Sequence, residues 1–348
     1  MKAFQLVRPG AMGELRSVAQ PAPGQGEVLI KVGGAGLCHS DLHFMHGDFA
    51  HVPYLNDNVP FTLGHEPAGW VEAVGAGVHG FERGQPVIVY PIFGCGHCAA
   101  CHAGLDHRCQ VHAASGPALG LGVNGALAEY MLVKSARQLL PLGDLDPRQA
   151  APLTDAALTP YHAIRRNLQR LRPGATVVVI GVGGLGQMAV QLLSVLSPAR
   201  IVAVDRSADK LAAARALGAA ATVVADAEAS RALRDATRGQ RADLVIDLVG
   251  VDATLKLAAS SVAAGGRIEV IGVAGGKLDW SFARLALEAS IGSSYWGTPT
   301  ELREIVALAQ AGRIGTRVER FTLDDTARAY GLLEAGQIEG RAVVTPHG

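Results

Sequence analysis

The chain has 348 residues, of which 49% are hydrophobic, 18% charged and 5% aromatic, and its 31 Lys and Arg side chains balance 31 Asp and Glu side chains. This composition predicts a soluble globular protein of about two domains, and it excludes disordered chains and small disulfide-stabilised scaffolds. A formal net charge of zero with no basic run disfavours a nucleic-acid partner and an anionic membrane surface.

Residues 1–10 contain no apolar run of the kind found in secretory signals, so a cytoplasmic location is expected. The first 150 residues are rich in Gly and Pro, and they contain short apolar runs bounded by turn residues, at 27–32 and 86–90. This pattern predicts a mostly β region.

From about Gly174 the pattern changes to strands and helices in alternation. The predicted strands are 176–180, 201–205, 222–224, 244–247 and 267–272, and the first two helices are 184–196 and 208–217. Glycines and glutamines interrupt the apolar segment 176–205, which favours a buried strand and helix over a membrane span. The alternation predicts a doubly wound parallel sheet with helices on both faces.

After Trp296 the sequence predicts helices over 300–311 and 324–335 and a closing strand over 341–345. The pattern alone leaves open whether this segment extends the α/β domain or returns to the first domain. No internal repeat or low-complexity linker separates the domains.

A glycine-rich turn follows the strand 176–180 and opens the next helix. Its residues are Gly181, Gly183, Gly184, Leu185 and Gly186. In this context the pattern predicts a dinucleotide site in which the pyrophosphate meets the helix N-terminus. The alternative is that the glycines only permit a tight turn.

Asp205 ends the following strand, where a carboxylate would accept hydrogen bonds from a ribose diol and repel a 2′-phosphate. NAD is therefore favoured over NADP. Arg206 leaves NADP use open, and Lys210 is a further predicted contact of the coenzyme. The alternative for Asp205 is a solvent-facing residue at the strand end.

Four of the five cysteines, Cys95, Cys98, Cys101 and Cys109, lie in one loop with the spacing C-x2-C-x2-C-x7-C. Four thiolates this close supply a closed tetrahedral shell, which predicts a structural zinc. Iron–sulfur ligation is the main rival, but Gln110 follows the last cysteine where bacterial ferredoxins have proline. Four free thiols are the remaining alternative, and they would be open to oxidation.

The fifth cysteine begins the run Cys38-His39-Ser40-Asp-Leu-His43, and Gly64-His65-Glu66 follows it. A thiolate and an imidazole suit zinc, but two ligands do not define a site.

With these motifs the chain resembles the zinc-dependent medium-chain alcohol dehydrogenases over essentially its whole length. Four segments carry the resemblance: 38–43, the G-H-E motif at 64–66 with Gly69, Gly75 and Val78, the cysteine lobe at 95–109, and the turn at 181–186. The resemblance implies a GroES-like β-barrel catalytic domain built from both chain ends around a Rossmann NAD-binding domain. The expected boundaries are 1–153 and 296–348 for the catalytic domain and 154–295 for the Rossmann domain.

The resemblance makes Cys38 and His65 ligands of a second, catalytic zinc, and Glu66 a nearby carboxylate that can reach the metal. Many family members have a cysteine as third ligand, but this chain has no sixth cysteine and offers Asp155 there. A carboxylate is a competent zinc ligand. The alternative is that Asp155 caps a helix. Two zinc ions per chain and NAD are therefore the expected cofactors.

The same resemblance assigns a proton relay, because Ser40 matches its hydroxyl and His43 its distal base. A surface imidazole without a role is the alternative for His43. His39 and Arg341 match contacts of the coenzyme pyrophosphate, although either could be an ordinary surface charge.

Further coenzyme contacts implied by the resemblance are Thr159 beside the nicotinamide and Val249, Val273 and Ser294 along its cleft. The candidate apolar substrate pocket comprises Phe44, Met45, Phe49, Tyr54, Leu119, Tyr295 and Trp296.

The sequence predicts hydride transfer between NAD(H) and a small alcohol or ketone. Asp155 with the segment 295–297 resembles secondary-alcohol enzymes that accept medium or aryl groups, whereas 38–43 resembles primary-alcohol enzymes of the yeast type. A polyol dehydrogenase, a non-catalytic zinc-binding module and a quinone reductase relative are the alternatives. A homotetramer or dimer is expected.

Overall fold

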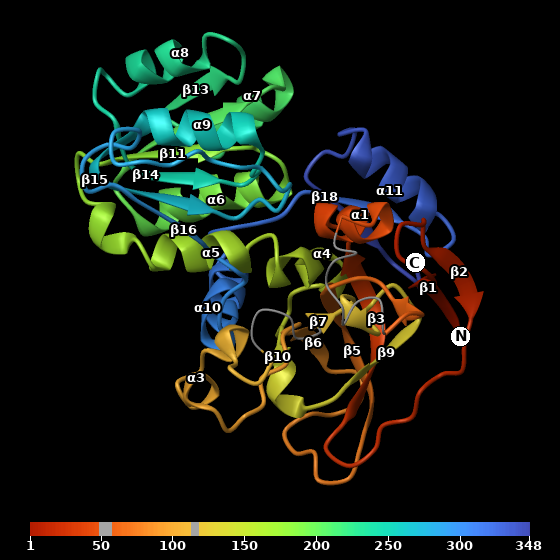
Figure 1. Cartoon of the computed structure of the whole chain (residues 1–348). Helices are drawn as coiled ribbons and strands as arrows, with labels where there is room; N and C mark the ends of the chain where they lie inside the picture. The colour runs from red at the N-terminus through yellow and green to blue at the C-terminus, as the bar shows by residue number, and fades with distance from the viewer. Residues whose placement is uncertain (49–57, 113–117) are drawn as a thin grey trace. The chain divides into compact units, whose positions relative to one another are not determined.

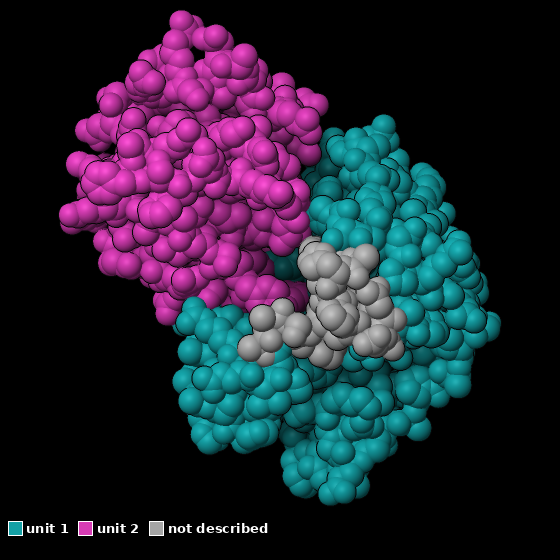
Figure 2. All heavy atoms as spheres, in the orientation of Figure 1, with its two compact units in different colours: residues 1–155, 298–348 teal, residues 156–297 magenta. Residues whose placement is uncertain are grey.

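The computed structural model describes residues 1–48, 58–112 and 118–348 and divides into two compact units, coloured teal and magenta in Figure 2. Unit 1 comprises Met1–Asp155 and Thr298–Gly348, and unit 2 comprises Ala156–Gly297. The expected domain boundaries lie two residues earlier at both junctions. Within the described ranges, no helix has the length and apolarity needed to cross a bilayer.

Unit 1 is built mainly from antiparallel β-structure (Figure 1), with parallel pairing of β17 with β18 and of β7 with β8. A three-stranded sheet has the order β2-β1-β4, with β1 Lys2–Leu6, β2 Glu14–Ser17 and β4 Phe61–Thr62. The larger sheet has the order β10-β6-β5-β3-β18-β17, and β9 also pairs with β3. Its strands are β3 Val28–Gly36, β5 Glu66–Val74, β6 Pro86–Val89, β9 Tyr130–Val133, β10 Leu139–Pro141, β17 Val318–Phe321 and β18 Arg341–Val344, and a short pair is formed by β7 Ala118–Leu119 and β8 Gly122–Val123.

The C-terminal segment completes the sheet that the N-terminal segment begins. Strand β18 pairs antiparallel with β3, with Val343 opposite Gly36 and Val344 opposite Ala35. This pairing resolves the alternative that the sequence pattern left open, and it confirms that both chain ends build the first unit. The helical elements of unit 1 are α1 His39–His46, α3 Ala99–His102, η1 Asp106–Arg108, η2 Ala136–Gln138, α4 Pro147–Ala150, η3 Ala151–Thr154, α10 Pro299–Gln310 and α11 Thr326–Glu334.

Unit 2 contains the predicted parallel sheet, in the order β13-β12-β11-β14-β15-β16, and Figure 1 shows helices on both of its faces. All five residues of β11 are buried, because a central parallel strand is covered on both faces, and the four residues after Thr176 are apolar. The strands are β11 Thr176–Ile180, β12 Arg200–Asp205, β13 Ala221–Val224, β14 Ala242–Asp247, β15 Val262–Val270 and β16 Ser290–Ser293, and the helices are α5 Leu158–Arg165, η4 Leu168–Arg170, α6 Gly184–Leu196, α7 Ala208–Ala216, α8 Ala229–Ala236 and α9 Asp252–Ser261.

Candidate active site and metal centres

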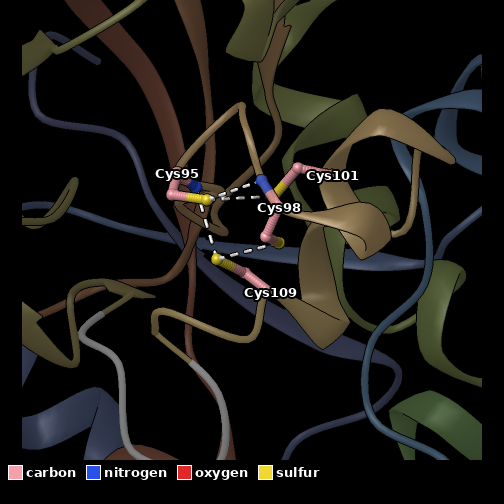
Figure 3. A group of neighbouring side chains, drawn as sticks. All are labelled: Cys95, Cys98, Cys101 and Cys109. Carbon is pink, nitrogen blue, oxygen red and sulfur yellow. Dashed lines mark hydrogen bonds between the residues drawn. The ribbon is translucent and has the colours of Figure 1, made fainter.

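The four cysteines of the lobe converge on one point (Figure 3). Their sulfur atoms all lie within 4.8 Å of one another. Helix α3 carries Cys101 and has Cys98 at its N-cap, while η1 ends at Cys109, so two short helical turns bring distant thiols together. The backbone N–H groups of Cys98 and Cys95 donate to the sulfurs of Cys95 and Cys109, both at 3.3 Å.

The lobe acts differently on its individual thiols, because burial raises the pKa of Cys101 to about 12. A backbone hydrogen bond from Cys101 is the largest of the contributions that lower the pKa of Cys98 to about 6. None of the four forms a disulfide. Four converging sulfurs with supporting amides fit a structural zinc ion and leave no position for a substrate.

A second donor set forms at the meeting point of three elements of unit 1. The donor atoms of Cys38, His65, Glu66 and Asp155 lie within 4.8 Å of one another, and all four side chains are buried. The Asp155 Oδ2 atom lies 3.5 Å from Cys38 Sγ and 3.7 Å from His65 Nε2. A thiolate, an imidazole and a carboxylate in this arrangement fit a zinc site with three protein ligands.

Local structure explains how these donors reach the site. Cys38 is the N-cap of α1, His65 stands directly before β5, and Asp155 is the residue at which η3 ends. The N-cap of the following helix α5 is Ala157, so the structure does not use Asp155 in the capping role that was its alternative.

Asp41, a buried carboxylate on α1, holds two of these donors. Its Oδ1 accepts a hydrogen bond from His65 Nδ1 at 3.0 Å, and its Oδ2 accepts one from the Cys38 backbone N–H at 3.0 Å. A metal-binding histidine commonly donates its second ring N–H to a carboxylate in this way, which leaves the other nitrogen for the metal.

Glu66 is held by Arg341 in a buried ion pair. The guanidinium contacts both carboxylate oxygens, and the exposed fraction is 4% for the Arg341 side chain and 0% for that of Glu66. Burial acts to raise the pKa of Glu66, and the positive charge of Arg341 opposes this rise and favours the carboxylate. Gly36 makes room for the pair, because a Cβ atom there would collide with the Glu66 carboxylate.

This environment differs from the surface position that was the alternative for Arg341. The Arg341 guanidinium pairs with the Glu66 carboxylate inside unit 1. Its contact with the coenzyme pyrophosphate stays a prediction.

Two predicted relay residues lie on one face of α1. Ser40 and His43 are three residues apart, a spacing that places side chains on the same side of a helix. The Ser40 Oγ lies 3.7 Å from Cys38 Sγ, which places this hydroxyl at the donor set. His43 Nδ1 pairs with Asp48 Oδ2 at 2.7 Å, and His39 is exposed.

The glycine-rich turn of unit 2 has the geometry of a dinucleotide site. Gly181 has a φ of 90°, and a Cβ atom on Gly186 would collide with the Gly181 carbonyl oxygen, so the turn packs tightly under the start of α6. Asp205 Oδ2 accepts a hydrogen bond from Val182 N at 2.7 Å, and Oδ1 accepts one from Ser207 N at 2.9 Å. Asp205 therefore fixes the glycine-rich turn, and its contact with a ribose stays a prediction.

Comparison with known proteins decides the family. Residues 24–144 match the model of the alcohol dehydrogenase GroES-like domain, and residues 184–311 match that of the zinc-binding dehydrogenases. An NAD-dependent alcohol dehydrogenase of Sulfurisphaera tokodaii is 36% identical, with 99% of this chain and 100% of that protein covered. The chain belongs to the zinc-binding alcohol dehydrogenase family. It is therefore an oxidoreductase, as the sequence predicted.

Two further relatives show how broad this likeness is. The crystal structure of an alcohol dehydrogenase from Aeropyrum pernix superposes with a TM-score of 0.93 at 36% identity, over 99% of this chain and 100% of that one. A D-arabinose 1-dehydrogenase (NADP(+)) of Saccharolobus solfataricus is 35% identical over 95% of this chain and 94% of that protein. The family assignment therefore fixes the fold and the reaction class, while the substrates of its members differ.

The other residues predicted to contact the coenzyme of this dehydrogenase differ in burial and in hydrogen-bond partners. Thr159 is buried in α5, and Val273 is 48% exposed. Val249 follows β14, where its N–H donates to Asp247. The buried Ser294 hydroxyl donates to Glu269 Oε2 at 3.3 Å, so this side chain already has a protein partner. Among the remaining contacts, Lys210 donates its backbone N–H to the cap of α7, Leu185 lies in the first turn of α6, and Arg206 is exposed.

The predicted substrate-pocket residues of the dehydrogenase belong to both units. Phe44 and Met45 lie on α1 and Leu119 on β7, all three buried, and the Gly13 N–H contacts Met45 Sδ at 3.4 Å. In unit 2 the rings of Tyr295 and Trp296 meet edge to face with centroids 5.0 Å apart, and Tyr295 is 54% exposed. Two further candidates lie outside the described residues: Phe49 and Tyr54.

Asp41 and Asp48 are partners of the predicted site residues that the sequence pattern of the dehydrogenase did not identify. Asp41 stands three residues after Cys38, and an acidic residue at this distance from a helix start is a recognisable capping signal. Asp48 follows the glycine that ends α1, and nothing in the local sequence marks it as a partner of His43.

Proposed function

We propose that this zinc-binding alcohol dehydrogenase transfers hydride reversibly between NAD(H) and an alcohol or ketone, with medium-sized secondary alcohols and aryl or alkyl ketones as its substrates. The observation that carries the proposal is the buried donor set of Cys38, His65 and Asp155. The relatives named as NAD-dependent alcohol dehydrogenases support NAD as the coenzyme. The small alcohol or ketone is the reaction partner.

Each donor set would hold one zinc ion. The ion of the cysteine lobe would be structural, and the ion at Cys38, His65 and Asp155 would be catalytic. Bound at Cys38, His65 and Asp155, zinc would act as a Lewis acid on the substrate oxygen, and NAD would accept the hydride. The turn at 181–186 and the N-terminus of α6 would bind the pyrophosphate, because unpaired backbone N–H groups attract anions there. Asp205 would bind the ribose hydroxyls.

Oxidation of an alcohol also releases a proton, which the protein must carry to solvent. The Ser40 hydroxyl lies beside Cys38 Sγ and can accept that proton while donating its own toward His43. When His43 Nδ1–H donates to Asp48, its Nε2 is left as a proton acceptor. The pair therefore presents His43 as the base at the solvent end of the relay.

Replacement of Asp48 by Asn should lower kcat for alcohol oxidation by about tenfold, because a neutral amide accepts from His43 Nδ1–H more weakly than a carboxylate and can also donate to Nδ1, so it no longer selects the tautomer with an unprotonated Nε2. A positioned base contributes 10²-fold or more. Steady-state kinetics at fixed pH would measure this. Glu334→Gln is the matched control, since it removes the carboxylate partner of another histidine on the same helix, His46. Equal kcat in Asp48→Asn and the wild type would remove Asp48 from the relay.

The substrate proposal rests on the residue types that the sequence offers for the substrate pocket. Leu119, Tyr295 and Trp296 are apolar or aromatic, which suits alkyl or aryl groups rather than a chain of hydroxyls. A polyol or sugar substrate is the second candidate, favoured by the likeness to a D-arabinose dehydrogenase.

A screen that varies the substrate and the coenzyme together separates the secondary-alcohol candidate from the sugar candidate. The rates of NADH and NADPH formation would be measured with 1-phenylethanol, 2-octanol, ethanol and D-arabinose. The proposal predicts the highest kcat/KM for a secondary alcohol with NAD, about tenfold or more above ethanol. Preference for D-arabinose with NADP would support the second candidate instead.

We also propose that the enzyme is a homo-oligomer that associates through the β16 edge of unit 2. Strand β16 ends the parallel sheet, and exposed edges pair readily with another chain. Large apolar side chains gather along this segment of the sequence with exposed fractions of 39–85%, which is unusual for a free surface: Trp280, Phe282, Leu287, Ile291 and Tyr295. A second copy of this chain is the occupant that a sheet edge fits best.

Ile291→Lys should therefore dissociate the oligomer, because a lysine at the centre of an edge-strand interface must be desolvated. Sedimentation velocity would show a shift toward the monomer mass. Val224→Lys is the matched control, since Val224 is 48% exposed on β13, the other edge strand. If Ile291→Lys keeps the wild-type mass, the interface lies elsewhere.

A further inference from the structure

A buried tyrosine reaches the metal centre from the C-terminal part of the chain. Tyr330 lies on α11, and its hydroxyl donates a hydrogen bond to Asp41 Oδ2 at 3.0 Å. The exposed fraction of both residues is 0%. The two are 289 positions apart in the sequence, so only the folded unit brings them together.

Asp41 is the link between this tyrosine and the donor set. It receives hydrogen bonds from Tyr330, from His65 Nδ1 and from the Cys38 backbone N–H, each at 3.0 Å. With Nδ1 held by Asp41, His65 turns Nε2 toward Asp155 Oδ2, 3.7 Å away. The orientation of Asp41 thus fixes the ring of one zinc ligand and the backbone of another.

We propose that Tyr330 is a positioning residue of the catalytic zinc centre, acting through Asp41 to hold His65 in its metal-binding orientation. Asp41 alone could rotate about its side-chain torsions, since carboxylate torsions of this kind are broad. A third donor from a different helix limits that rotation. Hydrogen-bonded residues behind metal ligands change metal affinity by about 10- to 100-fold when they are lost.

The hydroxyl remains a donor in this environment. Burial, together with the negative charge of Asp41, raises the pKa of Tyr330 well above its ordinary value. The phenol therefore stays protonated over the working range of an enzyme and donates rather than accepts.

Two other contacts also attach α11 to its surroundings, and they supply the controls. The Phe4 ring packs against the Tyr330 ring with centroids 6.0 Å apart. His46 Nε2 on α1 pairs with Glu334 Oε1 on α11 at 3.2 Å, half-exposed. Phe4→Leu changes the ring packing and Glu334→Gln the surface pair, and both keep the Tyr330 hydroxyl.

The test compares zinc release from the holoenzyme to an excess of chelator. Tyr330→Phe removes only the hydroxyl, and we expect release of the catalytic zinc to become about tenfold faster while the zinc of the cysteine lobe leaves at the wild-type rate. The absorption spectrum of cobalt exchanged into the catalytic site should also change. Phe4→Leu and Glu334→Gln should release zinc as the wild type does.

The coupling between the two residues gives a second criterion. In an Asp41→Asn background, Tyr330→Phe should have little further effect on zinc release, because the hydroxyl acts through the Asp41 carboxylate. Wild-type release from Tyr330→Phe, or equal acceleration by Tyr330→Phe, Phe4→Leu and Glu334→Gln, would overturn the proposal. The proposal for Tyr330 depends on the proposed function only in that the site of Cys38, His65 and Asp155 binds zinc. Holoenzyme with zinc in the cysteine lobe alone would mean that the proposed function had failed.

Discussion

Asp155→Ala should lose one of the two zinc ions and at least about 10²-fold in kcat/KM, because a Lewis-acid metal supplies several kcal/mol of transition-state stabilisation. The Asp155 carboxylate stands between Cys38 Sγ and His65 Nε2, at 3.5 and 3.7 Å. Glu66 lies in the same donor group, but its two carboxylate oxygens contact Arg341, whose guanidinium lies farther from Asp155 Oδ2, at 3.9 Å. Elemental analysis and steady-state kinetics on the same preparation would measure both losses.

Two companion variants make this result specific. Asp155→Cys should recover zinc and part of the activity, because a thiolate is an equally suitable ligand. Asp155→Asn keeps the shape of the side chain and removes its charge, so it should resemble Asp155→Ala in zinc content. The zinc of the cysteine lobe should stay in all three. Unchanged turnover in Asp155→Ala would remove this residue from the site.

Arg341→Met should lower the free energy of unfolding by about 3–5 kcal/mol, because it leaves the Glu66 carboxylate buried without its partner. The side chain of Glu66 has no exposed surface, so water cannot take the place of the guanidinium. Urea unfolding followed by circular dichroism, with zinc present throughout, would measure the loss.

A double variant separates the charge from the packing. Adding Glu66→Gln to Arg341→Met removes the unpaired charge and should restore most of the stability. Arg83→Met is the matched control, because Arg83 pairs with Glu72 at the surface with 76% of its side chain exposed, and such pairs contribute about 0–1 kcal/mol. Equal destabilisation by Arg83→Met and Arg341→Met would contradict this account of the buried pair.

The sequence allowed prediction of the fold wherever local pattern decides structure. Strand 176–180 and helix 184–196 are found with the predicted bounds, because an uninterrupted apolar run, a glycine turn and a long apolar helix leave few other conformations. Several strands of unit 1 are only two to four residues long, and their pairing depends on distant segments. The pairing of β18 with β3 joins the two ends of the chain, so the local pattern after Trp296 could not determine it.

The same limit applies to the candidate site. The cysteine lobe is local, so spacing alone predicted which four side chains would converge. Cys38, His65 and Asp155 required the family resemblance, since they come from three separate segments. The Tyr330 contact with Asp41 spans 289 positions, and the Arg341 contact with Glu66 spans 275. No local sequence pattern near these residues indicates either pairing.

The central claim is that one chain holds two zinc ions in two distinct donor sets. Elemental analysis of zinc per chain, on wild-type protein purified without added metal or chelator and again after zinc is added back, tests it most directly. The account predicts about two zinc ions per chain, one closed by four cysteines and one held by Cys38, His65 and Asp155. A value near one that does not rise when zinc is added would contradict it.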